Sequence, residues 1–303
     1  MSLLTILFLC ENVFIIKGAH YMKKYFVCSD IHGFYKEWIN SLKKAGFDEN
    51  NDEHILIALG DIFDRGKEPY KIYKFLYSLP QERLILVKGN HEYLLLELVK
   101  RKSPFEYDYH NGTYQTLISL YKDPWKEFLR RTRKDSCLKN DFEAFKRIER
   151  KLYTNKRINE IVEWLQSPQW LNYYELGQYI FVHSFIPLAG TGEILKRYVP
   201  DWRYTATKEM WEEATWGCPY RLYQLGKFDE ELAKGKILVC GHWHTSDFYN
   251  HLLFSNDSSK KLNIDEDNPI FKSPEYPGLI GLDACTVLTK TVNVLVIEEK
   301  DIG

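Results

Sequence analysis

The chain has 303 residues, a mass of 36.0 kDa, a net charge of −1 and a sequence pI of about 6.8. Hydrophobic residues make up 45% and charged residues 27%, which is ordinary for a soluble globular protein that buries a substantial core. This balance excludes a global basic field that would favour nucleic acid and an acidic block that would form a solvating tail.

Residues 1–21 are predicted to be an N-terminal extension outside the fold. The apolar run at 3–16 is interrupted by Glu11 and Asn12 and is too short to span a bilayer. It also lacks the basic start and the small-residue cleavage site of a secretory signal. Met22 opens MKKYFVCSD, which reads as a natural start that leads directly into a strand. A membrane-associated segment is the alternative interpretation.

The next part of the chain, up to residue 102, alternates short apolar runs with amphipathic helical patterns. Strands are predicted at 25–28, 54–59 and 84–88, and helices at 34–47, 69–79 and 91–102. This order predicts a mainly parallel, buried sheet with right-handed crossovers.

The character of the sequence changes between residues 103 and 170, where Lys, Arg, Glu and aromatic residues follow helical spacing without an obvious strand. We expect a helical cap, inserted at about 103–175, within one domain that spans 22–303. Its charge run RRTRKD at 130–135 is predicted to be a solvated helix face, with a binding surface as the alternative. Strands are predicted again at 179–183, 236–240, 279–283 and 292–298.

The six cysteines form no Cys-x-x-Cys pair, so neither a zinc ribbon nor a thioredoxin-like motif is indicated. Cys28 and Cys240 fall inside apolar runs and are expected to be buried as small hydrophobic residues. A reducing cytoplasm is the simplest expectation for the compartment.

Candidate metal ligands follow the predicted strands directly, where ligands bind in open α/β sheets. Five of the nine histidines lie at such strand ends. The residues of interest, in chain order, are Asp30, His32, Asp61, Asp64, Arg65, Asn90, His91, His183, His242 and His244. Carboxylate, imidazole and amide ligands suit Mn, Fe or Zn, and a set without thiolate argues against a structural zinc site. Two such metals about 3.5–4 Å apart form a clamp suited to in-line displacement at phosphorus.

The ordered motifs DIHG, GDIFDRG, GNHE, VH and GHWH resemble those of the calcineurin-like metallophosphoesterases. The DRG and NHE forms resemble the branch that holds the serine/threonine protein phosphatases (PPP), bacteriophage-type phosphatases and symmetrical diadenosine tetraphosphatases. The resemblance covers about residues 25–297. It implies a central β-sandwich flanked by helices in four αββα layers. It also implies a hydrolase with two divalent metal ions, Mn first, with Fe, Zn or Ni as alternatives.

The resemblance further implies a role for each matching residue. Asp30 and His32 would bind the first metal, and Asp61 would bridge both metals. The second metal would be bound by Asn90, His183 and His242. A metal-bridging hydroxide would attack phosphorus directly. His91 would protonate the leaving oxygen, Asp64 would orient His91, and Arg65 would bind the phosphate.

Expectations for five further residues follow from the resemblance and from their positions in the chain. His244 is the second histidine of a GHxH pattern, which the wider superfamily places on the first metal but the protein-phosphatase branch usually lacks; a surface histidine is the alternative. Arg221 is preferred over Arg203 as the second phosphate-binding arginine, and either could instead form a surface ion pair. Asp283 is expected to orient a ligand histidine, with a simple turn residue as the alternative. Glu92 is expected to belong to the first turn of its helix.

The resulting hypothesis is a phosphomonoesterase, with phosphorylated serine/threonine-type proteins as the leading substrates. The alternative is a symmetrical diadenosine tetraphosphate hydrolase or another nucleotide phosphohydrolase. A non-catalytic binding module that keeps the fold is a remote third reading. No nucleic-acid-binding module is evident in the sequence, and no stable membrane association is expected.

Overall fold

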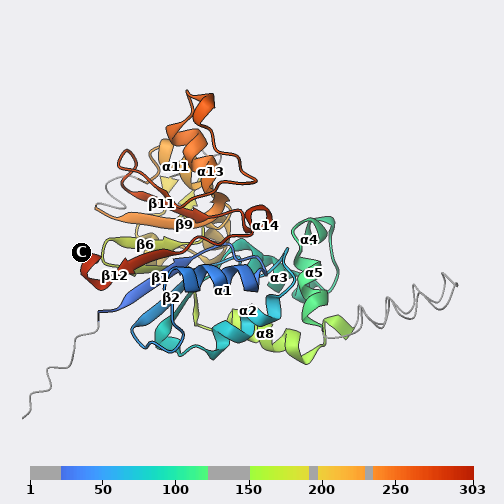
Figure 1. The fold of residues 1–303 in the computed structure, drawn as a ribbon. Helices are drawn as coiled ribbons and strands as arrows, with labels where there is room; N and C mark the ends of the chain where they lie inside the picture. The colour runs from blue at the N-terminus through green and yellow to red at the C-terminus, as the bar shows by residue number, and fades with distance from the viewer. Residues whose placement is uncertain (1–21, 122–150, 191–196, 229–234) are drawn as a thin grey trace, which may run out of the picture.

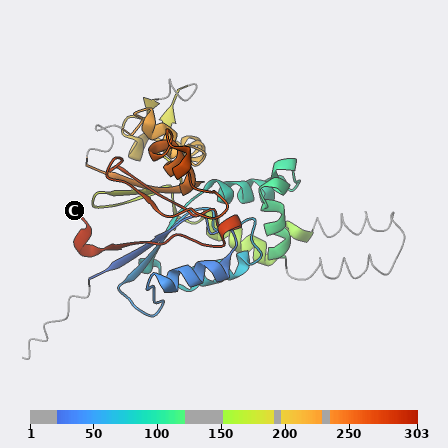
Figure 2. The same ribbon diagram turned by 45° about the horizontal axis from the view of Figure 1, so that its top comes forward.

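The computed structural model describes residues 22–121, 151–190, 197–228 and 235–303. Two five-stranded sheets pack face to face, and helices cover the outer face of each sheet (Figure 1). The view in Figure 2 brings the helices over the second sheet forward and keeps the same layers apart. The chain therefore has the four-layer αββα architecture that the resemblance implied.

The first sheet holds the predicted alternation of strands and helices. Its strands are β1 (Lys24–Cys28), β2 (His54–Leu59), β3 (Leu84–Val87), β4 (Trp170–Leu171) and β12 (Leu295–Glu298). The order is β12-β1-β2-β3-β4, parallel from β1 to β4, with β12 antiparallel to β1. Helices α1 (Tyr35–Lys44), α2 (Pro69–Ser78) and α3 (Asn90–Arg101) follow β1, β2 and β3. The predicted parallel sheet is confirmed.

These strands are continuous apolar runs because both of their faces are buried. Side chains alternate across a strand, so Val27 and Ile57 point into the core between the two sheets. Phe26 and Leu56 point the other way, into the core beneath the helices. Burial of each face therefore stabilises the fold by about 25 cal/mol for every Å² of apolar surface that is removed from water.

The second sheet has the order β10-β11-β9-β6-β5. Its strands are β5 (Tyr173–Leu176), β6 (Tyr179–Val182), β9 (Ile237–His244), β10 (Phe271–Lys272) and β11 (Leu279–Asp283). Its outer face is covered by α9 (Trp202–Thr205), α10 (Lys208–Ala214), α11 (Pro219–Gln224) and α13 (Thr245–Phe248). The ribbon β7 (Leu188–Ala189) with β8 (Arg197–Tyr198) and the short helix α14 (Thr286–Thr289) complete the main elements.

The described helices between residues 103 and 170 pack into the hydrophobic core on the helix side of the first sheet. They are α4 (Glu106–His110), α5 (Thr113–Leu120) and α8 (Lys156–Gln166). Leu117 of α5 and Trp164 of α8 pack in the same cluster as the helix side of the first sheet. The charge run at 130–135 and residues 1–21 lie outside the described residues.

The sequence prediction missed five strands: β4 and β5, which lie between residues 170 and 176, and the two-residue strands β7, β8 and β10. β4 pairs with β3, and β5 pairs with β6. β4 is only two residues long, and all four residues of β5 are partly exposed, so neither segment shows apolar alternation. The strands that the sequence did predict are all confirmed, with bounds that shift by a few residues.

The side chains of Cys28 and Cys240 are fully buried, as the sequence predicted. Among the described residues, no helix combines the length and the apolar character needed to cross a membrane.

Candidate dinuclear metal centre

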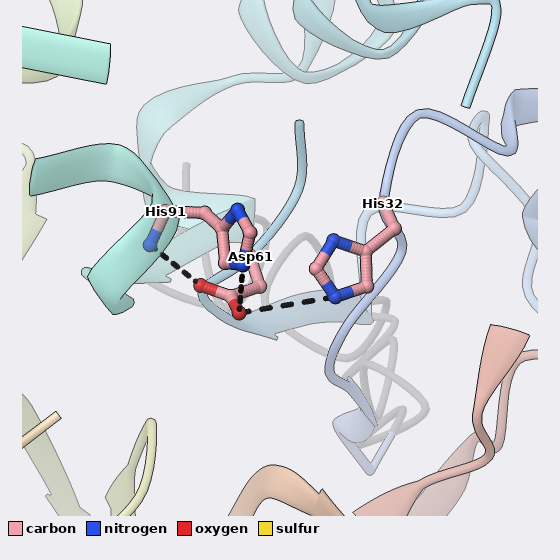
Figure 3. Close-up of side chains that lie close together, drawn as sticks. All are labelled: His32, Asp61 and His91. Atoms are coloured by element: carbon pink, nitrogen blue, oxygen red, sulfur yellow. Dashed lines mark hydrogen bonds and ion pairs between the residues drawn. The ribbon is translucent and has the colours of Figure 1, made fainter. Parts of the chain in front are cut away.

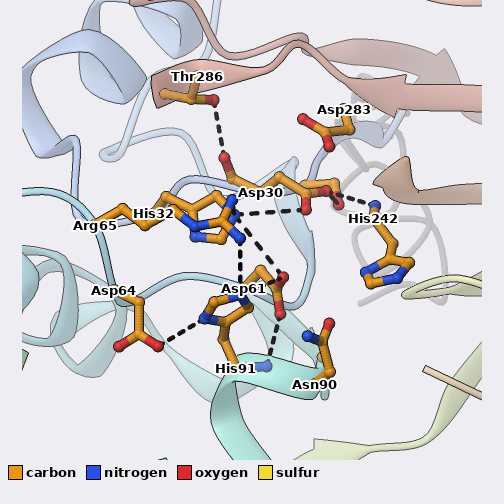
Figure 4. Close-up of polar contacts among 12 residues, drawn as sticks. Asp30, His32, Asp61, Asp64, Arg65, Asn90, His91, His242, Asp283 and Thr286 are labelled. Carbon is orange, nitrogen blue, oxygen red and sulfur yellow. Dashed lines mark hydrogen bonds and ion pairs between the residues drawn. The ribbon is translucent and has the colours of Figure 1, made fainter. Parts of the chain in front are cut away.

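The loops after β1, β2 and β3 and the end of β9 meet at one edge of the sandwich (Figure 4). Six polar residues of these segments adopt left-handed backbone conformations, which non-glycine residues rarely adopt. They are Asp30, His32, Asp61, Asp64, Arg65 and His242, with φ between 48° and 67°. Such conformations cost about 1–3 kcal/mol each and concentrate at functional sites.

Asp61 lies at the centre of this edge. Its Oδ1 is 3.4 Å from Nε2 of His183, and its Oδ2 is 3.9 Å from Nε2 of His32. Oδ2 is also 3.8 Å from Nε2 of His91 (Figure 3). These side chains form two sets whose ligand atoms lie close enough together to hold a metal ion. The sets are His32–Asp61–His91 and Asp61–His183–His242. Asp61 is shared by both sets, with one oxygen directed toward each.

Hydrogen bonds turn two imidazole rings so that Nε2 faces the centre. Nδ1 of His32 donates to the carbonyl of Phe63 at 3.1 Å, and Nδ1 of His183 donates to the carbonyl of Leu59 at 2.7 Å. A carbonyl can only accept, so Nε2 of each neutral ring carries a lone pair. Nε2 of His183 lies 2.9 Å from the buried Oδ1 of Asn90. Two facing lone-pair atoms are the arrangement that a shared cation satisfies.

Asp30 connects the two sheets. Its Oδ1 is 3.9 Å from Nε2 of His32, and its Oδ2 accepts hydrogen bonds from the Ser29 hydroxyl and, at 2.9 Å, from the backbone N–H of His242. Thr286 donates to its carbonyl oxygen at 2.8 Å. The carboxylate is therefore fixed beside His32 by groups from both sheets.

The electrostatic environment gives most of these groups the protonation states that metal ligands require. Burial lowers the pKa of His242 to about 3 and holds the pKa of His32 well below its ordinary value. Burial alone would raise the pKa of Asp61, but the surrounding histidines, His183 first, hold that pKa below its usual range. Burial raises the pKa of Asp30, a penalty that a neighbouring cation would offset. The donor set therefore fits divalent metal ions.

His91 has a different environment from the other histidines. Its Nδ1 lies 2.6 Å from Oδ2 of Asp64. Burial lowers the pKa of His91, but the charge of Asp61 and the hydrogen bond to Asp64 outweigh it and raise the pKa to about 9. These neighbours therefore favour the protonated form of the ring, whose Nε2 lies beside Asp61. Such a group can donate a proton.

Arg65 reaches the same centre. Its Nη1 and Nη2 lie 3.1 Å from Nε2 of His32 and 3.3 Å from Nε2 of His91. Its guanidinium therefore stands beside the candidate ligand His32 and the candidate acid His91, where an anionic oxygen can be bound through two parallel N–H groups.

Sequence reasoning missed three residues that support the site. Glu92 was expected only in the first turn of α3, yet its carboxylate accepts from the backbone N–H groups of Asp61 (2.8 Å), Ile62 (3.0 Å) and Gly89 (2.8 Å). The G-x-x-E spacing of a capping box was the available signal. The Thr113 hydroxyl donates a hydrogen bond to the Asp64 carboxylate, and the Thr116 hydroxyl accepts one from the Asp64 backbone N–H. No local pattern in the sequence indicated either threonine.

Four predicted residues lie at or beyond the edge of this network. The His244 side chain is 30% exposed; its Nε2 is 3.9 Å from Asp283, and it belongs to neither set of closely spaced ligand atoms among the described residues. Asp283 also accepts from the backbone N–H of Cys285 at 2.8 Å, as a turn residue does. Arg203 pairs with Glu175 and lies over the Trp202 ring. Arg221 is an exposed residue of α11, and its phosphate-binding role remains a prediction.

Comparisons with known proteins agree with this arrangement. The family described as calcineurin-like phosphoesterase matches residues 23–246. A symmetrical bis(5'-nucleosyl)-tetraphosphatase from Buchnera aphidicola (subsp. Acyrthosiphon pisum, strain 5A) is 43% identical over 75 residues, 25% of this chain and 26% of that protein. Shewanella-like protein phosphatase 1 of Plasmodium berghei is 32% identical over 124 residues, 35% of this chain and 34% of that protein.

Among solved structures, a cold-active protein-tyrosine phosphatase of a psychrophilic Shewanella species aligns with a TM-score of 0.48 and 17% identity, over 92% of this chain and 76% of that one. The curated relatives match over only about a quarter to a third of their own length. The family match covers most of this chain, including every motif that contributes to the candidate metal centre. The chain belongs to the calcineurin-like phosphoesterase family.

Proposed function

We propose that this protein hydrolyses phosphate esters with two divalent metal ions held by seven residues, which are Asp30, His32, Asp61, Asn90, His183, His242 and His244. The observation that carries the proposal is the position of Asp61 between two sets of ligand atoms, with one oxygen toward each. A single carboxylate shared in this way is the geometry of a two-metal phosphoryl-transfer site.

The chain's own residues would perform the remaining steps. When bound, the cations would supply Lewis acidity, lowering the pKa of water and offsetting charge on the phosphate. Arg65 would bind equatorial phosphate oxygens, assisted by Arg221. His91 would transfer its Nε2 proton to the departing oxygen, while Asp64 accepts from Nδ1 and keeps the ring aligned.

The leading substrates in this proposal are phosphomonoesters of proteins, as the DRG and NHE motifs indicated. A second candidate, hydrolysis of symmetrical dinucleoside tetraphosphates, has a specific observation in its favour. Several matched relatives carry that name, at up to 43% identity over a quarter of their length. Manganese is the proposed metal.

A pocket beside the metal centre is a candidate site for the part of the substrate beyond the phosphate. It has a volume of about 210 Å³ and is lined by Phe185, Trp216 and Trp243 among others. Trp216 is 48% exposed, and the centroid of its ring lies 5.9 Å from that of His242. Aromatic walls of this kind favour a planar or apolar group attached to the phosphate.

Hydrolysis by metal-stripped protein, with and without Mn²⁺, tests the proposal, with phosphate release measured for the peptides and nucleoside diphosphate formation for the dinucleotide. The substrates would be a phosphoserine peptide, a phosphotyrosine peptide and diadenosine tetraphosphate. Mn²⁺-dependent release from a peptide is the expected result. Cleavage of the dinucleotide alone, to nucleoside diphosphates, would replace the first candidate by the second. No turnover of any substrate, by protein that calorimetry finds loaded with metal, would contradict the hydrolase proposal.

A further inference from the structure

The N-terminal turn of α5, in the insertion, touches the loop that carries Asp64 and Arg65. The Thr113 hydroxyl donates to Oδ2 of Asp64 at 2.7 Å, and the backbone N–H of Asp64 donates to the Thr116 hydroxyl at 2.9 Å. Gly112 lies so close that a Cβ built on it would be 2.6 Å from the backbone nitrogen of Arg65. One turn of helix therefore holds both residues.

Thr113 shares its acceptor atom with the candidate acid. Oδ2 of Asp64 accepts from Nδ1 of His91 at 2.6 Å and from the Thr113 hydroxyl at 2.7 Å. All three residues are buried, so water cannot replace a lost donor without rearrangement. Asp64 also has a left-handed backbone, with φ of 66°, which its surroundings must maintain. The hydroxyl thus fixes the carboxylate in the rotamer that holds His91.

We propose that Thr113 is a positioning residue for proton donation: it holds the Asp64 carboxylate, through which it aligns His91 with the leaving oxygen. This inference rests on the proposed function. It gives the insertion a role in the chemistry. Thr116 fixes the backbone of the same loop, and Gly112 admits the close approach.

The kinetic test compares substrates that differ in their need for an acid. Thr113→Val keeps the shape of the side chain and removes the donor. We expect kcat for a phosphoserine peptide to fall by about tenfold or more, the effect of one hydrogen bond to a charged group. The fall should be much smaller for p-nitrophenyl phosphate, whose leaving group needs little protonation, and KM should change little. Thr113→Ser should restore most of the rate.

Ser119→Ala is the matched control. Ser119 lies on the same helix and donates to the Thr116 carbonyl, without contacting Asp64. It should keep the wild-type ratio between the two substrates. Equal losses of Thr113→Val on both substrates, or no loss on either, would overturn the proposal.

A measurement without catalysis separates this inference from the proposed function. The proton in the 2.6 Å bond between His91 and Asp64 should give a downfield NMR resonance, assigned by its loss in His91→Asn. In Thr113→Val, we expect its exchange with solvent to be about tenfold faster, and Thr113→Ser should resemble wild type. An unchanged exchange rate in a folded Thr113→Val protein would overturn the role of Thr113, even if the protein proved to have no phosphatase activity.

Discussion

At the scale of single residues, the candidate roles of metal binding and proton donation fall to Asp61 and His91, whose environments differ. Asp61 is buried among histidines, whose charges hold the pKa of its carboxyl group below the usual range. His91 is buried beside the carboxylates of Asp61 and Asp64, which raise the pKa of its ring to about 9. Two fully enclosed groups with opposite charges and different partners are typical of an active site whose acid and ligand roles are set by environment.

Asp61→Asn should abolish the binding of two metal ions. The amide keeps the size of the side chain but removes the charge and one lone-pair oxygen, so at most one of the two sets of ligand atoms keeps its oxygen from this residue. We expect metal affinity to fall by more than about 100-fold, since even partners of ligands contribute about 10–100-fold. Titration calorimetry with Mn²⁺ measures it. Asp257→Asn, the same change at a partly exposed loop residue that pairs with Lys260, should bind as wild type; unchanged stoichiometry in Asp61→Asn would show that Asp61 is not a ligand.

His91→Asn should slow turnover according to the leaving group. Loss of a positioned acid costs on the order of 10²–10⁴-fold where the leaving oxygen must be protonated. We expect a loss in that range for a phosphoserine peptide and a much smaller one for p-nitrophenyl phosphate. If both substrates slow equally while metal binding falls, His91 is a metal ligand, as its place in the His32–Asp61–His91 set would allow.

At the scale of elements, α3 builds the site from its first turn. Asn90 and His91 begin the helix, and Glu92 ties it to the loop after β2. Burial first, and then the charge of Asp61, raise the pKa of Glu92 to about 7. One helix end thus supplies a candidate ligand, a candidate acid and the acceptor that fixes the Asp61 backbone.

Glu92→Ala should lower the free energy of unfolding by about 3 kcal/mol. It leaves three buried backbone N–H groups without their acceptor, and each unsatisfied group costs about 1–3 kcal/mol before relaxation. Glu92→Gln keeps one carbonyl oxygen and should cost less. Urea denaturation measures both. Glu97→Ala removes an exposed ion pair from the same helix and should cost less than about 1 kcal/mol; a similar cost for Glu92→Ala would contradict this account.

At the scale of the whole molecule, the site exists because the two sheets meet closely at one edge. Gly241 of β9 touches the loop after β1: a Cβ there would lie 1.8 Å from the Ser29 hydroxyl oxygen and 2.1 Å from Oδ2 of Asp30. The absence of a side chain lets the backbone N–H of His242 reach Asp30 at 2.9 Å. The candidate ligands of the two sheets are brought together by this contact.

Gly241→Ala should therefore impair both stability and metal binding. The methyl group must push β9 away from Asp30, and overpacking of this kind costs about 1–3 kcal/mol. Thermal melting and Mn²⁺ calorimetry should both change. Gly278→Ala, just before β11, meets its nearest atoms at an ordinary 3.5 Å and should change neither greatly. A Gly241→Ala protein with wild-type metal affinity would show that this contact does not set the ligand geometry.

The sequence predicted much of the fold and of the candidate site because both leave local signals. The buried strands are uninterrupted apolar runs, and the ligands follow them directly, as Asp30 follows β1 and His183 follows β6. β4 and β5 were missed because a two-residue strand and a half-exposed strand carry no periodic pattern. The role of Glu92 was only partly foreseen, since its helix position is local but its bonds to the Asp61 loop are not.

By itself, the sequence determined the family, the alternation of strands and helices, and the candidate ligands, all of which depend on patterns within a few residues. The tertiary structure alone decided which oxygen of Asp61 faces which histidine and how Thr113 reaches Asp64 across 49 positions. It also decided how His242 meets Asp30 across 212 positions. These contacts depend on how two sheets and an inserted helix pack, and no short-range pattern in a chain encodes the distance between residues that only packing brings together.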